Sequence, residues 1–262
     1  MNASPSSMPT GGSNPASGAS GAPAATPPAT AGSAVETDGR PCPAARIAEL
    51  VALYGGLPVA LAVCRRAIEG IPVIPVLWVA ALPMAVWLRR RRARGASETS
   101  ASPCGSRNAW KREWPRVLLR ACLGFALLWG WMRWQHPEWL WSLPAKQPKA
   151  WLAVVAGYPV LSVVPQGVVY RAFFRERYAA CLRNRAMFRL AAALCFAFSH
   201  VVFLHWQTVA LTFLGGLLFT RTYERTDSLG LSNLEHALYG AILFTLGYDR
   251  YLAGGTLALI GP

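Results

Sequence analysis

The sequence has few acidic residues, since 12 Asp and Glu stand against 26 Lys and Arg and give a formal net charge of +14. Transporters of protons or ions normally carry several carboxylates inside the membrane, so this scarcity argues against a transporter. The 6 cysteines are scattered and form no CxxC pair. Their spacing indicates neither a zinc site nor a disulfide framework.

Strand-like alternation of polar and apolar residues is missing too, and no fixed-period repeat is visible. The chain is 53% hydrophobic, and its apolar residues form blocks of about 16 to 22, the length that a helix needs to cross a bilayer. The sequence therefore predicts an all-α fold, a polytopic membrane helix bundle with about seven transmembrane helices. We expect the spans at residues 47–64, 71–88, 116–134, 151–174, 187–204, 206–222 and 233–253.

Composition divides the chain into four segments. Residues 1–43 are rich in Ala, Pro, Ser, Gly and Thr, and such a segment cannot bury enough apolar surface to offset the entropy lost on ordering. We expect a disordered tail there. It lacks a basic start followed by an apolar core, so the first span is the expected targeting element. Membrane helices are expected at 44–149, a membrane core at 150–254 and a C-terminal tail at 255–262.

The basic residues predict the orientation, because Lys and Arg in short loops stay on the cytoplasmic side. The run at Arg89–Arg94 follows the second span, and further arginines follow the spans at 151–174 and 206–222. We expect a multi-pass protein of the plasma membrane, as in a bacterial inner membrane, with a cytoplasmic N-terminus. The Trp-rich segment at 136–151 fits an aromatic belt on the far side. Charges placed beside spans are explained by the bilayer, so nucleic acid is not an expected partner.

A few polar residues lie inside predicted spans, where an ionisable group is costly and by default marks a functional site. They fall on three helices: Gln166 and Arg171, His200, and Glu235 with His236. His200 is either a core histidine bonded to a carbonyl or hydroxyl, with Ser199 nearby, or one of two neutral imidazoles that hold a metal or an oxyanion. Its ring should lie beside Phe196, four residues earlier.

Glu235 has two interpretations. Ser232-Asn233-Leu234-Glu235 has the S-x-x-E form of a capping box, which predicts that Glu235 caps the last helix. The other interpretation makes Glu235 a catalytic base. Adjacent helical residues point about 100° apart, so Glu235 and His236 do not easily address one substrate, and the cap is favoured.

The order of these elements resembles the CPBP family of intramembrane endopeptidases, which includes the CAAX prenyl-proteases and the Abi proteins. The resemblance covers about residues 150–250 and rests on a Pro-x-x-x-x-Tyr-Arg helix, then Phe-x-x-x-His, then His-Ala-Leu-Tyr. In that family the motifs are Glu-Glu-x-x-x-Arg, Phe-x-x-x-His and His-x-x-x-Asn. They fall on Arg171, on Phe196 to His200, and on the segment that begins at His236.

Three positions depart from the family's motifs. Gln166 and Gly167 stand where the two glutamates would be, and Gly240 stands where the Asn would be. The resemblance implies that the first glutamate activates water while the histidines and the Asn position water or metal and stabilise the oxyanion. A carboxamide cannot take the proton. Without a glutamate at 167, Arg171 is expected to reach a carbonyl, a lipid phosphate, Glu176 or Glu235, or to snorkel to the interface.

Two functions follow. The favoured one is a non-catalytic relative that binds a membrane-embedded peptide or protein. The alternative is an active endopeptidase whose base is Glu235 or a hydroxide on a divalent metal such as zinc, held by His200 and His236; two histidines alone are a poor zinc site. Either way, Gln166, His200 and His236 are expected to converge within the bundle.

Overall fold

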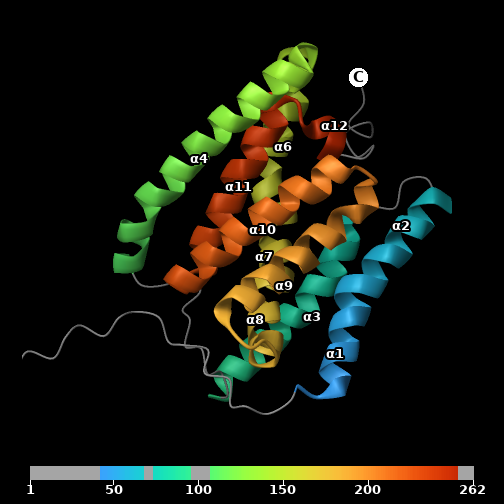
Figure 1. Ribbon diagram of the computed structural model, residues 1–262, viewed down its shortest axis with the longest axis vertical. Coiled ribbons are helices and arrows are strands. Elements are labelled where there is room, and N and C mark those ends of the chain that lie inside the picture. Colours follow the sequence, from blue (N-terminus) through green and yellow to red (C-terminus); the bar gives the residue numbers. More distant parts are fainter. Residues whose placement is uncertain (1–41, 68–72, 96–106, 253–262) are drawn as a thin grey trace, which may run out of the picture. The chain divides into compact units, whose positions relative to one another are not determined.

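The computed structural model describes residues 42–67, 73–95 and 107–252, and every regular element in these ranges is helical. The predicted all-α membrane bundle is confirmed. The predicted C-terminal tail and the disordered tail, apart from its last two residues, lie outside the described ranges. The helices, drawn in Figure 1, are α1 (Ala44–Val51), α2 (Leu57–Ala67), α3 (Val73–Ala93), α4 (Arg107–Gln135), α5 (Ser142–Lys146), α6 (Pro148–Tyr158), α7 (Val164–Gly167), α8 (Phe174–Tyr178), α9 (Arg185–Phe198), α10 (Trp206–Thr226), α11 (Leu229–Leu246) and α12 (Asp249–Leu252).

Several of these helices join into longer ones through π-helical turns. Helices α1 and α2 are continuous through Ala52–Gly56, and α6, α7 and α8 are continuous through Pro159–Val163 and Val168–Phe173. Among the described residues, four helical stretches are long and apolar enough to cross a membrane: Ala44–Cys64, Val73–Ala93, Pro148–Cys181 and Arg185–Phe203. They correspond to four of the predicted spans. The other three predicted spans fall on α4, α10 and α11, which are 29, 21 and 18 residues long but are not apolar enough to qualify.

A disulfide joins Cys42 to Cys181, although the cysteine spacing predicted none. The two ends that it joins must lie on the same side of a bilayer, so the chain between them crosses an even number of times. Three of the qualifying stretches lie in that interval. We therefore expect helix α4 to be the fourth crossing, in agreement with the predicted span at 116–134.

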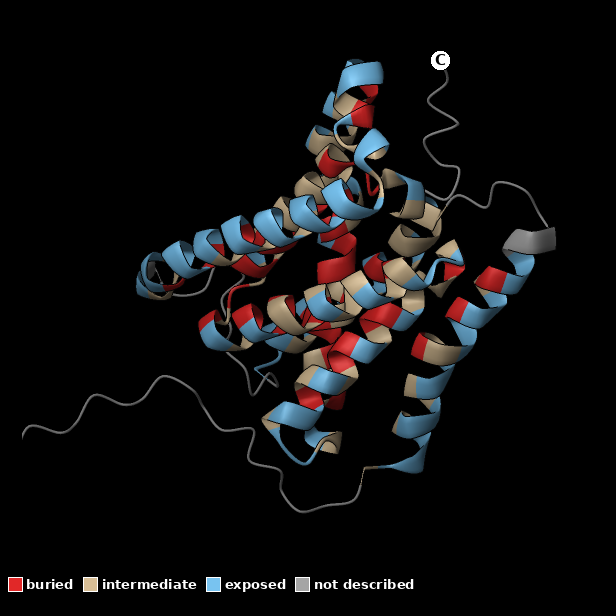
Figure 2. Ribbon diagram, turned by 45° about the horizontal axis from the view of Figure 1, so that its top comes forward, coloured by how far each residue is buried: buried red, intermediate tan, exposed pale blue. Residues whose placement is uncertain are grey.

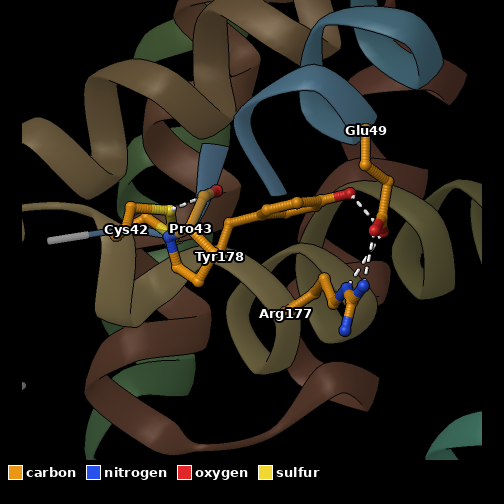
Figure 3. Close-up of a disulfide and its surroundings, with 6 residues drawn as sticks. Cys42, Pro43, Glu49, Arg177 and Tyr178 are labelled. Carbon is orange, nitrogen blue, oxygen red and sulfur yellow. Dashed lines mark hydrogen bonds and ion pairs between the residues drawn. A yellow bond between two sulfur atoms is a disulfide. The ribbon is translucent and has the colours of Figure 1, made fainter. Parts of the chain in front are cut away.

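Polar contacts also join the first span to the end of α8, next to this disulfide. Arg177 donates two hydrogen bonds to the Glu49 carboxylate at 3.0 and 2.5 Å, and the Tyr178 hydroxyl donates a third at 2.9 Å (Figure 3). Tyr54, in the π-helical turn between α1 and α2, packs edge-on against Phe174 and Tyr178. The first span is therefore attached to the end of the helix that carries the first motif.

Ion pairs connect the loops that were predicted to be cytoplasmic. Arg91 at the end of α3 pairs with Glu176 at 2.6 Å, and Arg175 pairs with Asp227 after α10 at 2.5 Å. These three segments therefore meet at one end of the bundle, as the alternating topology requires. In Figure 1 the start of α1 lies at this lower end, whereas α12 lies at the other end.

Large apolar side chains cover much of the outside of the bundle. Figure 2 shows α4 exposed along most of its length. Val79 on α3, Leu127 on α4 and Leu214 on α10 are 74%, 76% and 58% exposed, more than a water-soluble surface normally tolerates over several helices. This surface is suited to lipid.

Candidate functional site

The first motif lies on the continuous helix formed by α6 to α8, where α-helical and π-helical turns alternate. Gln166 and Gly167 end α7, and Arg171 lies in the π-helical turn at Val168–Phe173. All three are buried, and Arg171 is only 3% exposed. Inserted π-helical turns are frequent at functional sites because they redirect side chains.

Arg171 contacts helix α11. Its Nη2 donates to Asn233 Oδ1 at 3.1 Å and lies 3.3 Å from His236 Nδ1. Because a guanidinium only donates, Nδ1 must accept, and the proton of this neutral imidazole belongs on Nε2. Nε2 can then donate to the Tyr158 hydroxyl at 2.9 Å. Arg171 thus finds partners that the sequence did not predict, since they are neither Glu176 nor Glu235.

His200 lies in a 3-10 turn, Ser199–Phe203, that follows α9. Its Nδ1 is 2.7 Å from the Phe196 carbonyl oxygen and 3.1 Å from Ser199 Oγ, so Nδ1 carries the proton. These two contacts agree with the interpretation of His200 as a core histidine bonded to a carbonyl and a hydroxyl. The Phe196 ring lies between the two histidines, with centroid distances of 4.8 Å to His200 and 5.4 Å to His236.

Gln166 is near this group but has no contact with either imidazole among those the structure gives. Its Nε2 donates to Ser162 Oγ at 2.8 Å. Its Oε1 is buried and accepts no hydrogen bond. One turn further on, the Tyr170 ring packs against Phe196 at 5.4 Å, which brings the helix of Gln166 against the helix of His200.

The capping box predicted for Glu235 is wrong. The cap of α11 is Ser228, whose Oγ accepts from Leu231 N at 3.2 Å, while Ser232 lies inside the helix and donates to the Phe219 carbonyl. Glu235 is completely buried and pairs with Arg120 on α4, with N–O distances of 2.8 and 3.0 Å. Glu235 lies about two turns inside the helix, where the backbone N–H groups already have partners, so its side chain bonds another helix instead.

We compared the chain with known proteins, and one protein family matches the segment that carries these contacts. A family model described as Rce1-like, type II CAAX prenyl endopeptidase, matches residues 147–242. Residues 147–242 form an Rce1-like domain. The resemblance to the CAAX proteases is thereby confirmed, and the chain is a multi-pass membrane protein. Searches of curated proteins and of solved structures found no match.

In the Rce1-like domain, Gly167 and Gly240 stand where the family's motifs have larger residues. Neighbouring side chains fill the space beside each of these two glycines. A Cβ built on Gly167 would lie 2.1 Å from Asn233 Oδ1, and one on Gly240 would lie 2.1 Å from the Tyr158 ring. Both distances are far inside van der Waals contact. Asn233 therefore occupies the space next to position 167 and binds Arg171, while Tyr158 occupies the space next to position 240 and binds His236.

The donor set of the Rce1-like domain does not fit a divalent metal. Both ring nitrogens of His236 are engaged, and Nδ1 faces a guanidinium whose positive charge repels a cation. Within the ranges that the structure describes, no three His, Cys, Asp or Glu side chains gather as a metal site would need. His200 and His236 therefore stay a predicted pair without a third ligand among the described residues.

Three residues of this site were not among the predicted ones: Tyr158, Asn233 and Arg120. Asn233 was detectable, because it precedes His236 by three residues and so shares its helix face. Arg120 lies four residues into the predicted span at 116–134, where basic residues that set the topology are also common. Tyr158 carries no signal in the sequence, since aromatic residues are common in spans.

Proposed function

We propose that the chain is a non-catalytic relative of the intramembrane endopeptidases, which binds a membrane-embedded peptide or protein without cleaving it. The observation that carries this proposal is at Gln166. A general base has to accept a proton near neutral pH, and a carboxamide does not. Its amide donates to Ser162 at 2.8 Å and so holds the side chain within its own helix.

The other candidate bases are held by neighbouring groups. Glu235 is completely buried, and its Oε1 is bound by Arg120, while its Oε2 accepts no hydrogen bond from the described residues. His236 accepts from Arg171 and contacts Tyr158, so neither ring nitrogen is free. His200 has Nδ1 bonded to a carbonyl and would act alone, without a carboxylate to activate a water. These contacts support binding over hydrolysis.

The surroundings support a peptide as the ligand. The matched family is described as a prenyl endopeptidase, and an endopeptidase acts on a peptide chain. A buried amide oxygen without a partner, Gln166 Oε1, is an acceptor for a backbone N–H. A site of this kind can keep recognition after it has lost the base, because the two depend on different groups.

The experiment measures binding and cleavage in the same sample. Purified full-length protein in lipid nanodiscs is incubated with prenylated and unprenylated membrane peptides, and product is followed by mass spectrometry. We expect binding with no product. Cleavage that disappears in Glu235→Gln, with thermal stability unchanged, would establish the alternative of an active endopeptidase with Glu235 as its base.

We also propose that the N-terminus is cytoplasmic and that the protein belongs to the plasma membrane. The ion pairs that join the Arg-rich loops at one end of the bundle support this orientation.

A further inference from the structure

A small cavity lies beside α12, at the end of the bundle opposite to the start of α1 (Figure 1). Its volume is about 100 Å³. Residues of α5, of the turn before α6 and of α12 line it: Ser142, Leu143, Lys146, Gln147, Asp249 and Arg250. Pockets for whole drug-sized ligands have about 300–1,000 Å³, so this cavity accommodates a small charged group rather than a peptide. It shares no residue with the contacts of Arg171, His200 and His236.

The lining contains two exposed basic residues, Lys146 and Arg250. Among the described residues, no carboxylate lies within ion-pair distance of either side chain. Arg250 lies instead against the Trp139 ring, with its guanidinium carbon 5.0 Å from the ring centroid, and this cation–π contact holds the charge at the cavity. Two cations in one lining, neither of them bound to a counter-charge there, are suited to a phosphate.

The lining also contains a carboxylate with an unsatisfied oxygen. Asp249 Oδ1 is buried and accepts no hydrogen bond from the residues that the structure describes. Buried polar atoms normally have a partner, and a carboxylate oxygen needs a hydrogen-bond donor. A phosphodiester alone carries no such donor, and its charge would be repelled by the carboxylate. The lining is therefore complementary to a ligand that combines a phosphate with an ammonium group.

The cavity belongs to the segment that was predicted to form an aromatic belt. Trp139 and Trp141 shortly precede α5, and Trp141 is 42% exposed. Tryptophan side chains are enriched at the level of the lipid headgroups, and basic pockets beside membrane helices bind phospholipid headgroups. The surrounding bilayer is therefore the nearest source of a ligand that contains a phosphate.

We propose that this cavity binds the headgroup of phosphatidylethanolamine, a phosphodiester that carries a primary ammonium group. Lys146 and Arg250 bind the phosphate oxygens, and Asp249 accepts a hydrogen bond from the ammonium. The acyl chains stay in the bilayer, since the cavity has room for the headgroup's charged groups only. This site is independent of the proposed function, because no residue of the three motifs takes part in it.

The test compares three phospholipids with identical acyl chains. Full-length protein purified in detergent is titrated with each lipid, and bound lipid is measured by native mass spectrometry. Phosphatidylglycerol has the phosphate without the ammonium, and phosphatidylcholine has methyl groups in place of the N–H donors. We expect phosphatidylethanolamine to bind about tenfold more tightly than either, as for a hydrogen bond between charged groups. Binding of phosphatidylethanolamine equal to that of either other lipid would overturn the proposal.

Lys146→Gln tests the phosphate contact. We expect this variant to bind both phosphatidylethanolamine and phosphatidylglycerol about tenfold more weakly than the parent does. Lys149→Gln is the matched control, because Lys149 is an exposed lysine only three residues further on and does not line the cavity. It should bind both lipids as the parent does. Equal losses in the two variants would contradict the site, since they would show a general effect of surface charge.

Asp249→Asn tests the ammonium contact. We expect it to lose most of the preference for phosphatidylethanolamine over phosphatidylcholine, because the carboxylate charge is gone while the shape is kept. Glu138→Gln removes an exposed carboxylate that does not line the cavity and should keep the preference. A preference that survives in folded Asp249→Asn contradicts the assignment. If that variant does not fold, the comparison of Lys146→Gln with Lys149→Gln still decides the site.

A final competition separates a lipid from a soluble ligand. Phosphoethanolamine has the same phosphate and ammonium but no acyl chains. We expect an equal concentration of it to leave phosphatidylethanolamine bound, because the chains add apolar contacts with the surface of the bundle. Displacement of the lipid at equal concentration would overturn the assignment to a membrane lipid.

Discussion

Gly167 and Asn233 provide a test of the idea that the site has been repacked around its missing glutamate. In Gly167→Ala the new Cβ would lie 2.1 Å from Asn233 Oδ1. Either the core is overpacked or Asn233 turns away and loses its hydrogen bond to Arg171. Each route costs about 1–3 kcal/mol. Alanine recovers about 0.5–1 kcal/mol through its higher helix propensity, so the net loss lies between about 0 and 2.5 kcal/mol, with a middle value of about 1 kcal/mol.

The same substitution should change sign when Asn233 is removed. In an Asn233→Ala background no side chain fills the space, so Gly167→Ala should stabilise the protein by about 0.5–1 kcal/mol. Gly130→Ala is the matched control, because Gly130 on α4 has nothing within 4 Å of a built Cβ. It should stabilise the protein in both backgrounds.

Equilibrium unfolding in detergent micelles, followed by circular dichroism, measures all these variants. A Gly167→Ala cost that is equal with and without Asn233 would refute the reasoning, since the two residues would then not be coupled.

Three more predictions concern other contacts. Glu235→Gln leaves Arg120 without a counter-charge and should cost about 1–3 kcal/mol in the same unfolding assay; adding Arg120→Gln should cost less in that variant than in the parent, and additive costs would contradict the pair. Gly240→Ala should cost about 1–3 kcal/mol because its Cβ meets the Tyr158 ring, and the cost should shrink in Tyr158→Leu; an undiminished cost would show that the ring is not the obstacle. If the N-terminus is cytoplasmic, Cys42 should be a free thiol in intact cells and form its disulfide only on oxidation. Acid-quenched thiol labelling that finds it oxidised in cells would place the N-terminus outside.

Much of the fold could be predicted from the sequence, because the information lies in single segments. Blocks of apolar residues long enough to cross a bilayer indicate membrane helices without reference to their neighbours. The face shared by Gly167 and Arg171 follows from their spacing of four residues, and both do meet Asn233. Four of the predicted spans correspond to helical stretches that are long and apolar enough to cross a membrane. The disulfide requires an even number of crossings between Cys42 and Cys181, which supports a fifth span on α4.

The partners across the bundle could not be predicted, because they depend on how distant helices pack. Arg171 and Asn233 are 62 residues apart, and Arg120 and Glu235 are 115 apart. The S-x-x-E pattern was misleading for a local reason. Ser228 begins the helix one turn earlier, so Glu235 is free to pair with α4. The disulfide was missed because cysteine spacing carries no information on which segments fold together.

The central claim is that the site lacks a working base, and rebuilding the family's motif tests it most directly. The variant Gln166→Glu/Gly167→Glu/Asn233→Ala restores both glutamates and clears the space that Asn233 occupies. Cleavage of a prenylated membrane peptide is compared between this variant and the parent at equal concentration in nanodiscs. We predict product from the rebuilt variant and none from the parent. Turnover by the parent that is lost in Gln166→Ala would contradict the account, because it would show that the carboxamide site is catalytic.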